Sequence, residues 1–300
     1  MTIFEPAAID ARLAQGLVAR QFPRLAHLPV VPVSRQGVDN RTFRLGDRLS
    51  VRLPAGDRYA LAVEKEHRWL PRLAPGLPLP IPQPVAQGMP AREYPYPWSI
   101  YRWLDGSPVT DTAVCDRIAF ATALGEFLAA LRRQDPADAP LPGPHSWFRG
   151  APVSTYAAET HRALDALGVE INRADVERVW DDAQRSTWTG APVWFHGDIA
   201  TGNLLVEHGR LSAVIDFGTC GVGDPACDTT IAWTYLADDS RAAFRAALGV
   251  DAATWSRGRG WVVWKTLITL VGELERDDRS GARRSRAVLD RVVAEHRGDR

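Results

Sequence analysis

Apolar side chains in the first quarter of the chain follow two different periods. Residues 5–22 carry them at helical spacing on one side: Ile9, Leu13, Leu17 and Val18. The segment TFRLGDRLSVRLP then alternates apolar and polar positions, which predicts a β-hairpin. Gly46-Asp47 suits a two-residue turn between the two strands. The alternation places Arg52 on the face opposite the apolar residues of its strand.

Residues 59–73 return to a helical period, and one member of their apolar stripe is charged. Glu66 falls among the apolar positions of this stripe. A carboxylate on a buried helix face costs several kcal/mol unless a cation pairs with it. Glu66 therefore calls for a cationic partner. Pro71, inside the same pattern, is expected to kink or end the helix.

Strands come early in the chain and helices come late. Residues 71–97 hold nine prolines and read as an extended connector, after which WSIYRW reads as a buried strand. Helical patterns follow at residues 118–131, 154–187, 226–248, 253–276 and 280–297. This order predicts an α+β protein with two lobes that meet near residue 103. We expect one lobe in residues 1–103 and the other in residues 104–300.

Composition and charge exclude several classes of protein. The formal net charge is zero, so nothing draws the whole chain toward nucleic acid or an anionic membrane. No signal peptide and no uninterrupted apolar stretch long enough for a membrane helix is evident. Three dispersed cysteines form no disulfide or zinc pattern. We expect a soluble protein of the reducing cytoplasm. Lysine occurs only at Lys65 and Lys265.

The segment from 192 to 228, PVWFHGDIATGNLLVEHGRLSAVIDFGTCGVGDPACD, carries the candidate chemistry. Asp198 and Asn203 lie in a polar loop before a predicted hairpin, and Asp216 follows that hairpin. Because an antiparallel return brings the end of the second strand beside the start of the first, Asp216 must lie near Asn203. One carboxylate can deprotonate a hydroxyl while the other oxygen donors hold Mg²⁺ on nucleotide phosphates. Phosphoryl transfer needs such a set.

HGDIATGN followed by IDFG resembles the catalytic and metal-binding signature of the aminoglycoside phosphotransferase family, which is related to the protein kinases. The resemblance spans most of the chain and implies a two-lobed kinase-like fold with a small antiparallel sheet in the N-terminal lobe. It implies that Asp198 is the catalytic base and that Asn203 and Asp216 bind Mg²⁺. His196 would be structural, and Asp228 would brace the catalytic loop.

The N-terminal half matches the family more loosely. Kinases pair a strand lysine with a helix glutamate to hold the α- and β-phosphates, and here the resemblance places Arg52 at the lysine position. Its natural partner is Glu66, with Glu64 as the rival. Gly37-Val38-Asp39-Asn40 stands where a glycine-rich loop is expected. By the same alignment, the backbone groups of Arg102 and Leu104 would contact adenine.

The expected phosphate donor is ATP, with GTP as an alternative. The phosphate acceptor is less well defined. A polycationic aminoglycoside favours an acidic pocket, yet residues 224–275 contain seven acidic and five basic side chains, and two of the acids already have roles. Asp238 and Asp239 are the predicted acceptor contacts. Tryptophans such as Trp261 and Trp264 either pack in the core or stack on the acceptor.

The sequence thus predicts transfer of the γ-phosphate of ATP to a hydroxyl of a small molecule, such as an aminoglycoside, another hydroxylated antibiotic or a metabolite. The alternative is a kinase-like regulator that binds nucleotide with little or no turnover. The weak glycine loop and the arginine in place of lysine motivate that alternative. The sequence leaves the oligomeric state open.

Overall fold

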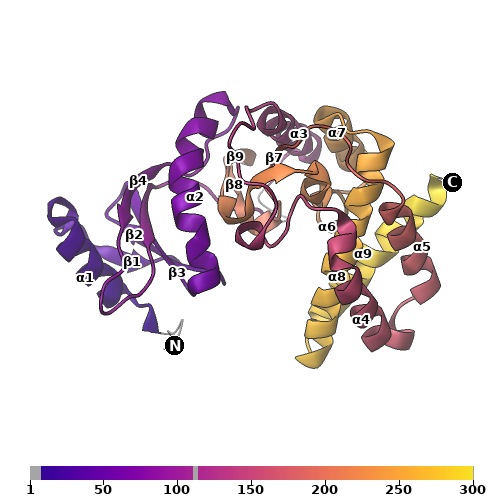
Figure 1. The fold of residues 1–300 in the computed structure, drawn as a ribbon, viewed down its shortest axis with the longest axis horizontal. Coiled ribbons are helices and arrows are strands. Elements are labelled where there is room, and N and C mark those ends of the chain that lie inside the picture. The colour runs from indigo at the N-terminus through magenta and orange to yellow at the C-terminus, as the bar shows by residue number, and fades with distance from the viewer. Residues whose placement is uncertain (1–7, 111–113, 300) are drawn as a thin grey trace.

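The computed structural model describes residues 8–110 and 114–299. Its N-terminal part is a five-stranded antiparallel sheet in the order β1-β2-β3-β5-β4, flanked by two helices (Figure 1). The elements are α1 (Ala11–Gln21), β1 (Val30–Pro32), β2 (Asn40–Leu45), β3 (Leu49–Pro54), α2 (Asp57–Leu73), β4 (Pro84–Gly88) and β5 (Trp98–Arg102).

The β2–β3 hairpin confirms the alternating pattern and corrects its turn. Leu45 pairs with Leu49, so three residues rather than two join the strands. Gly46, the first of them, has φ 57°, a left-handed conformation that costs glycine little. The extended connector is also corrected, because it contains the strand β4. Backbone pairing with β5 overrides the weak strand preference of its proline-rich sequence.

Helix α2 runs between the sheet and the helical part of the molecule (Figure 1). Its buried face carries Val63, Trp69, Leu70 and Leu73, as the helical stripe requires. Pro71 lies inside the last turn and the helix continues to Leu73. The same face also buries Lys65 and Glu66. Two charged residues on a buried helix face require polar partners in the structure that packs against them.

The C-terminal part consists mainly of helices around two small sheets. Its strands are β6 (Ser107–Pro108), β7 (Val193–Phe195), β8 (Leu204–Glu207), β9 (Arg210–Val214) and β10 (Gly221–Gly223). Its α-helices are α3 (Arg117–Arg132), α4 (Ala157–Leu167), α5 (Arg173–Gln184), α6 (Ile231–Thr234), α7 (Asp238–Leu248), α8 (Ala252–Glu275) and α9 (Arg279–Gly298). Gly168, at φ 49°, separates α4 from α5, where the sequence pattern suggested one helix.

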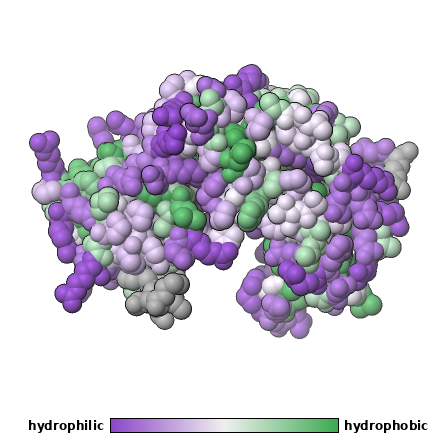
Figure 2. Space-filling view, viewed as in Figure 1, coloured by the Kyte–Doolittle hydropathy of each residue, from purple (hydrophilic) through white to green (hydrophobic). Residues whose placement is uncertain are grey.

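Apolar side chains form two core clusters. One lies between the five-stranded sheet and α1, and the other joins the helical part to the C-terminal turns of α2. The molecule is arched and hollowed between its sheet-containing end and its helical end (Figure 2). Among the described helices, none is both long enough and apolar enough to span a bilayer. The loop that carries Asp198 and Asn203 lies in the helical part, after β7.

Candidate functional site

The loop after β7 is held in place by two side chains. Asp228 accepts hydrogen bonds from the backbone N–H groups of His196 (2.9 Å) and Gly197 (2.7 Å). His196 is fully buried, and its Nε2 lies 3.0 Å from the carbonyl oxygen of Ile215. Burial raises the pKa of Asp228, while His196 and the two backbone donors oppose that rise. These contacts tie the start of the loop to the residue just before Asp216.

Asp198 is half-buried and is oriented by Asn203. The Nδ2 atom of Asn203 donates to both the backbone oxygen and the Oδ2 atom of Asp198, each at 2.9 Å. Asp198 therefore keeps its Oδ1 atom free of this amide. A carboxylate fixed by one oxygen and free at the other can accept a proton from a bound hydroxyl.

The β8–β9 hairpin brings Asp216 to the same loop, as the antiparallel return requires. Leu204 pairs with Val214, and the N–H of Ile215 donates to the carbonyl oxygen of Asn203 at 2.9 Å. Asp216 itself adopts φ 67° and ψ 66°. A non-glycine residue in this region is uncommon and tends to occur at functional sites.

Arg52 forms an ion pair with Asp216 across the two parts of the molecule. The Nη2 atom of Arg52 lies 2.9 Å from Oδ1 of Asp216, whose side chain is 30% exposed. Burial tends to raise the pKa of Asp216, but the charge and hydrogen bond of Arg52 outweigh it and leave that pKa lowered. Burial likewise tends to lower the pKa of Arg52, and Asp216 and Glu66 raise it overall. The ionised pair is therefore the stable form.

Glu66 is the second carboxylate beside Arg52. Its Oε1 atom lies 3.7 Å from Nη1 of Arg52 and has no hydrogen-bond partner, while its Oε2 atom accepts the hydroxyl of Tyr101. Burial raises the pKa of Glu66, and Arg52 and Tyr101 oppose that rise. The rival, Glu64, lies on the exposed face of α2. The partner of Arg52 is thus Glu66 rather than Glu64, as the position of Glu66 on the apolar stripe predicts.

The oxygen atoms around this loop suit a hard divalent cation bound together with a nucleotide. Asn203 uses its nitrogen for Asp198, which leaves its Oδ1 atom outside that contact. Asp216 binds Arg52 through Oδ1 and accepts a backbone hydrogen bond from Gly218, which leaves Oδ2 outside the ion pair. No group of three or more His, Cys, Asp or Glu side chains in the described residues could hold a metal. Mg²⁺ commonly binds through one or two protein oxygens plus substrate phosphates, which fits this sparse set.

Backbone groups of the segment after β5 differ in their availability. The N–H of Arg102 donates to Gln83 and that of Trp103 donates to Arg48, at 2.9 and 2.8 Å. Leu104 is half-buried and lies outside the strands. Of the two predicted adenine contacts, Leu104 lies in a loop, where backbone groups can meet a ligand. The N–H of Arg102 is already bonded within the protein.

Asp39, in the loop before β2, faces the two candidate catalytic carboxylates. Burial and the charges of Asp216 and Asp198 together raise its pKa to about 6, against the charge of Arg52 and a hydrogen bond with Tyr59. This acid lies at the position of the degenerate glycine loop. The sequence shows the loop but assigns its aspartate no role, because nothing local signals that Asp198 and Asp216 are near.

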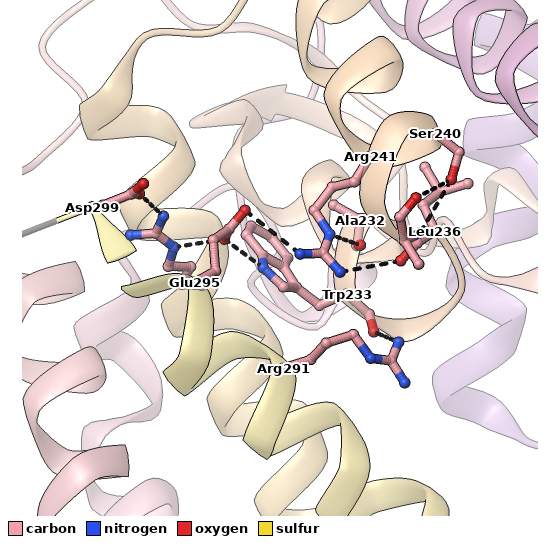
Figure 3. A network of polar contacts seen from close by, with 10 residues as sticks. Ala232, Trp233, Leu236, Ser240, Arg241, Arg291, Glu295 and Asp299 are labelled. Atoms are coloured by element: carbon pink, nitrogen blue, oxygen red, sulfur yellow. Dashed lines mark hydrogen bonds and ion pairs between the residues drawn. The ribbon is translucent and has the colours of Figure 1, made fainter. Parts of the chain in front are cut away.

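The predicted acceptor contacts lie in another part of the helical region. Asp238 and Asp239 begin α7, and Asp238 lines a hollow of about 530 Å³ together with Arg241, Arg245 and Trp255. No hydrogen bond or ion pair in the described residues joins either aspartate to Asp198. Arg241 donates to Ala232 and faces Glu295 at 3.8 Å, within a polar network that ties α7 to α9 (Figure 3).

Other side chains approach Asp198 without having been predicted. Arg149 donates from Nε to the carbonyl oxygen of Gly197 at 3.2 Å. Lys265 lies on the exposed side of α8. Desolvation by its neighbours and the charge of Arg149 lower its pKa, and Asp198 and Asp39 raise it. The large tryptophans of α8, Trp261 and Trp264, are buried in the core. The rarity of lysine was the only sequence signal that could have drawn attention to Lys265.

Comparisons with known proteins show the family and the fold of this chain. The chain matches the model of the phosphotransferase enzyme family (APH) over residues 30–261. It is 28% identical over 144 residues to an aminoglycoside 3'-phosphotransferase of Escherichia coli, which is 42% of this chain and 51% of that protein. The match therefore spans about half the length of this curated relative.

Solved structures share the fold over nearly the whole chain. The GDP complex of aminoglycoside 2'-phosphotransferase-IIIa has a TM-score of 0.69 at 19% identity, covering 96% of this chain and 99% of that one. The macrolide 2'-phosphotransferase MphH from Brachybacterium faecium has a TM-score of 0.62 at 20% identity, covering 92% and 97%. The fold is thus the two-lobed α+β kinase-like fold. Because the family model covers more than half of its residues, this chain belongs to the phosphotransferase enzyme family.

Proposed function

We propose that this protein transfers the γ-phosphate of ATP to a hydroxyl of a small molecule. The observation that carries the proposal is the pair of oriented carboxylates: Asp198 held by Asn203, and Asp216 held by Arg52, each at 2.9 Å. Residues 1–103 would form the nucleotide-binding lobe, and residues 104–300 the catalytic and acceptor-binding lobe. Phosphoryl transfer depends mainly on positioning and on electrostatic stabilisation, which such a set supplies.

The nucleotide would lie between the sheet and the Asp198 loop. Arg52, anchored beside Glu66, would hold the α- and β-phosphates, and the backbone of Arg102 and Leu104 would contact the base. Arg52 is a planar fork, so it can hold a phosphate through two parallel hydrogen bonds. Similar solved structures include GDP, ADP and ATP complexes. We keep GTP as an alternative donor.

Asn203 and Asp216 would hold Mg²⁺ on the phosphates, and when bound the ion would offset charge on the transferred group. Asp198 would accept the proton of the acceptor hydroxyl through its free oxygen. Asn203 would keep that oxygen aimed at the hydroxyl, and Asp228 would hold the loop through His196 and Gly197. The two positioning contacts, from Asn203 to Asp198 and from the loop backbone to Asp228, already exist without a ligand.

The acceptor would be a hydroxylated small molecule bound on the Asp198 side. Two similar structures are complexes with kanamycin and streptomycin, and another protein with the same fold is a macrolide phosphotransferase. Here the cations Arg149 and Lys265 approach Asp198. Since like charges repel, we expect neutral hydroxylated acceptors to be used better than polycationic ones. Asp238 and Asp239 stay a prediction for acceptor contacts.

The test is a screen with aminoglycosides, macrolides, nucleosides, sugars and amino alcohols that measures release of ADP from ATP and of GDP from GTP. The proposal expects acceptor-dependent ADP release and a phosphorylated product by mass spectrometry. Thermal shift with Mg·ATP runs alongside it, because ligand binding raises the melting temperature. A shift with Mg·ATP but no transfer to any acceptor would instead support the nucleotide-binding regulator.

A further inference from the structure

Lys65 of α2 places its amino group among backbone carbonyls of the C-terminal part. Its Nζ atom lies 2.7 Å from the carbonyl oxygen of Gly218, 2.9 Å from that of Cys220 and 3.3 Å from that of His145. A fourth contact, at 3.1 Å, joins Nζ to Nδ1 of His145. None of these four acceptors is a carboxylate. The lysine side chain thus spans two loops that are remote in sequence from α2.

The tautomer of His145 determines which atom donates and which accepts in its contact with Lys65. Its Nε2 atom lies 2.9 Å from the carbonyl oxygen of Leu141, which can only accept, so Nε2 carries the hydrogen. The Nδ1 atom of this neutral ring is then an acceptor for Lys65. Burying an amino group costs several kcal/mol unless its donors are satisfied. Lys65 is only 9% exposed, and the four acceptors satisfy its three N–H groups.

The loop that Lys65 grips is the one that carries Asp216. Gly218 and Cys220 lie two and four residues beyond Asp216, in the turn Phe217–Thr219 and just after it. Helix α2 packs directly on this turn, since a Cβ atom on Gly218 would lie 3.7 Å from that of Ala62.

Neighbouring residues of α2 therefore reach Asp216 by two routes. Glu66 acts from one side, through Arg52, which binds the Asp216 carboxylate. Lys65 acts from the other side, through the backbone that follows Asp216. The left-handed conformation of Asp216 is uncommon for an aspartate and persists only where its surroundings hold it.

We propose that Lys65 is a positioning residue that latches α2 onto residues 218–220 and thereby fixes the Asp216 carboxylate for a divalent cation. The latch itself follows from contacts in the structure. Its consequence for the cation rests on the proposed function. The Asp198 loop reaches the same turn through a different group, since the Thr219 hydroxyl donates to the carbonyl oxygen of His196 at 3.0 Å.

Hydrogen exchange in the nucleotide-free protein tests the latch without any activity. Lys65→Met removes the donors while keeping an unbranched chain of similar length. Arg68→Met is the matched control, because Arg68 is an exposed cation on the same helix. We expect the peptide covering residues 216–222 to exchange at least about tenfold faster in Lys65→Met alone, through local opening. Unchanged exchange there, or an equal increase along the whole chain, would overturn the latch.

Where Lys65→Met does not fold, Lys65→Gln takes its place, because an amide keeps donors but is too short to reach three carbonyls together. The same selective increase at residues 216–222 is expected, and its absence overturns the proposal.

Calorimetry of ADP binding with and without Mg²⁺ tests the consequence. We expect Lys65→Met to weaken binding of Mg·ADP by about tenfold and to leave metal-free ADP binding unchanged, while Arg68→Met matches wild type. Equal Mg·ADP affinity in the variant and wild type would refute the positioning role. Failure of the wild-type protein to bind nucleotide would contradict the proposed function, and the exchange result would still decide the latch.

Discussion

At the scale of single residues, Asp198 and Asp39 show how position decides the behaviour of a carboxylate. Asp198 is held by an amide donor and keeps one oxygen free. Asp39 is half-buried and faces two other acids, and its burial together with their charges raises its pKa to about 6. The residue type is the same, and the burial, charges and donors around each carboxylate differ.

Asp198→Asn should keep nucleotide binding and lose turnover. The amide cannot accept the hydroxyl proton, and base catalysis contributes on the order of 10²–10⁴-fold to such rates. The measurement is kcat on the acceptor found in the screen, with Mg·ATP thermal shift as the binding control. Asp47→Asn, an exposed aspartate in the β2–β3 turn, is the matched substitution. Full turnover in Asp198→Asn would remove this residue from the mechanism.

Asp39→Asn should stabilise the ligand-free protein at neutral pH. Because the folded pKa is about 6 and the ordinary value is 3.8, the folded state binds this proton more tightly. The resulting stability is fully present below about pH 4 and is lost as pH rises through about 6. At pH 8 the variant should be more stable than wild type by about 1 kcal/mol, a value reduced for solvent screening of a half-buried group.

Urea unfolding of both proteins between pH 4 and 8 measures the difference, with Asp47→Asn as control. A constant difference across this range would show that Asp39 does not titrate between those limits.

At the scale of elements, glycine has opposite effects in two helices. Gly125 lies where α3 packs on α7, and a Cβ atom there would be 2.8 Å from the carbonyl oxygen of Phe244 and 3.0 Å from the N–H nitrogen of Leu248. Gly16 lies inside α1, and its Cβ atom would meet only the end of the Arg20 side chain at 3.9 Å.

Gly125→Ala should destabilise the protein by about 1–3 kcal/mol, because backbone atoms of α7 must move to admit the methyl group. Gly16→Ala should stabilise it by about 0.5–1 kcal/mol, because alanine loses less conformational entropy in a helix. Thermal or urea unfolding of the two variants checks both signs. A stabilising Gly125→Ala would show that α3 does not pack this closely on α7.

The elements were predicted unevenly, for a physical reason. The β2–β3 and β8–β9 hairpins and the helix around Glu66 have strong periods, and the structure contains all three. Strand β4 lies among prolines and forms by pairing with β5, a partner that local sequence does not reveal. The three-residue β2–β3 turn follows from the Leu45–Leu49 register, which pairing across the whole sheet sets.

At the scale of the whole molecule, the reactivity of the three cysteine thiols shows whether solvent reaches the core. Cys115 is exposed, whereas Cys220 and Cys227 are buried. Burial raises the pKa of Cys220 to about 11 and that of Cys227 well above its usual range. Because the thiolate is the reactive form, both buried thiols should be inert in the native protein.

Labelling with a disulfide reagent at pH 8 should therefore modify one thiol rapidly and the other two only as the protein unfolds. In Cys115→Ser the rapid phase should vanish, and in urea all remaining thiols should react. Rapid labelling of two or three thiols in the native protein would contradict the closed core.

The sequence alone determined the constellation of Asp198, Asn203 and Asp216, because a hairpin is a local structure and its return places the two ends together. It also singled out Glu66, because a charge on an apolar stripe is visible in the period. Only the tertiary structure decided that Arg52 lies closer to Asp216 than to Glu66, and that Lys65 grips the backbone beyond Asp216. The contacts of Arg52 with Asp216 and of Lys65 with Gly218 join residues more than 150 positions apart, and no local pattern encodes which carbonyls a buried lysine will reach.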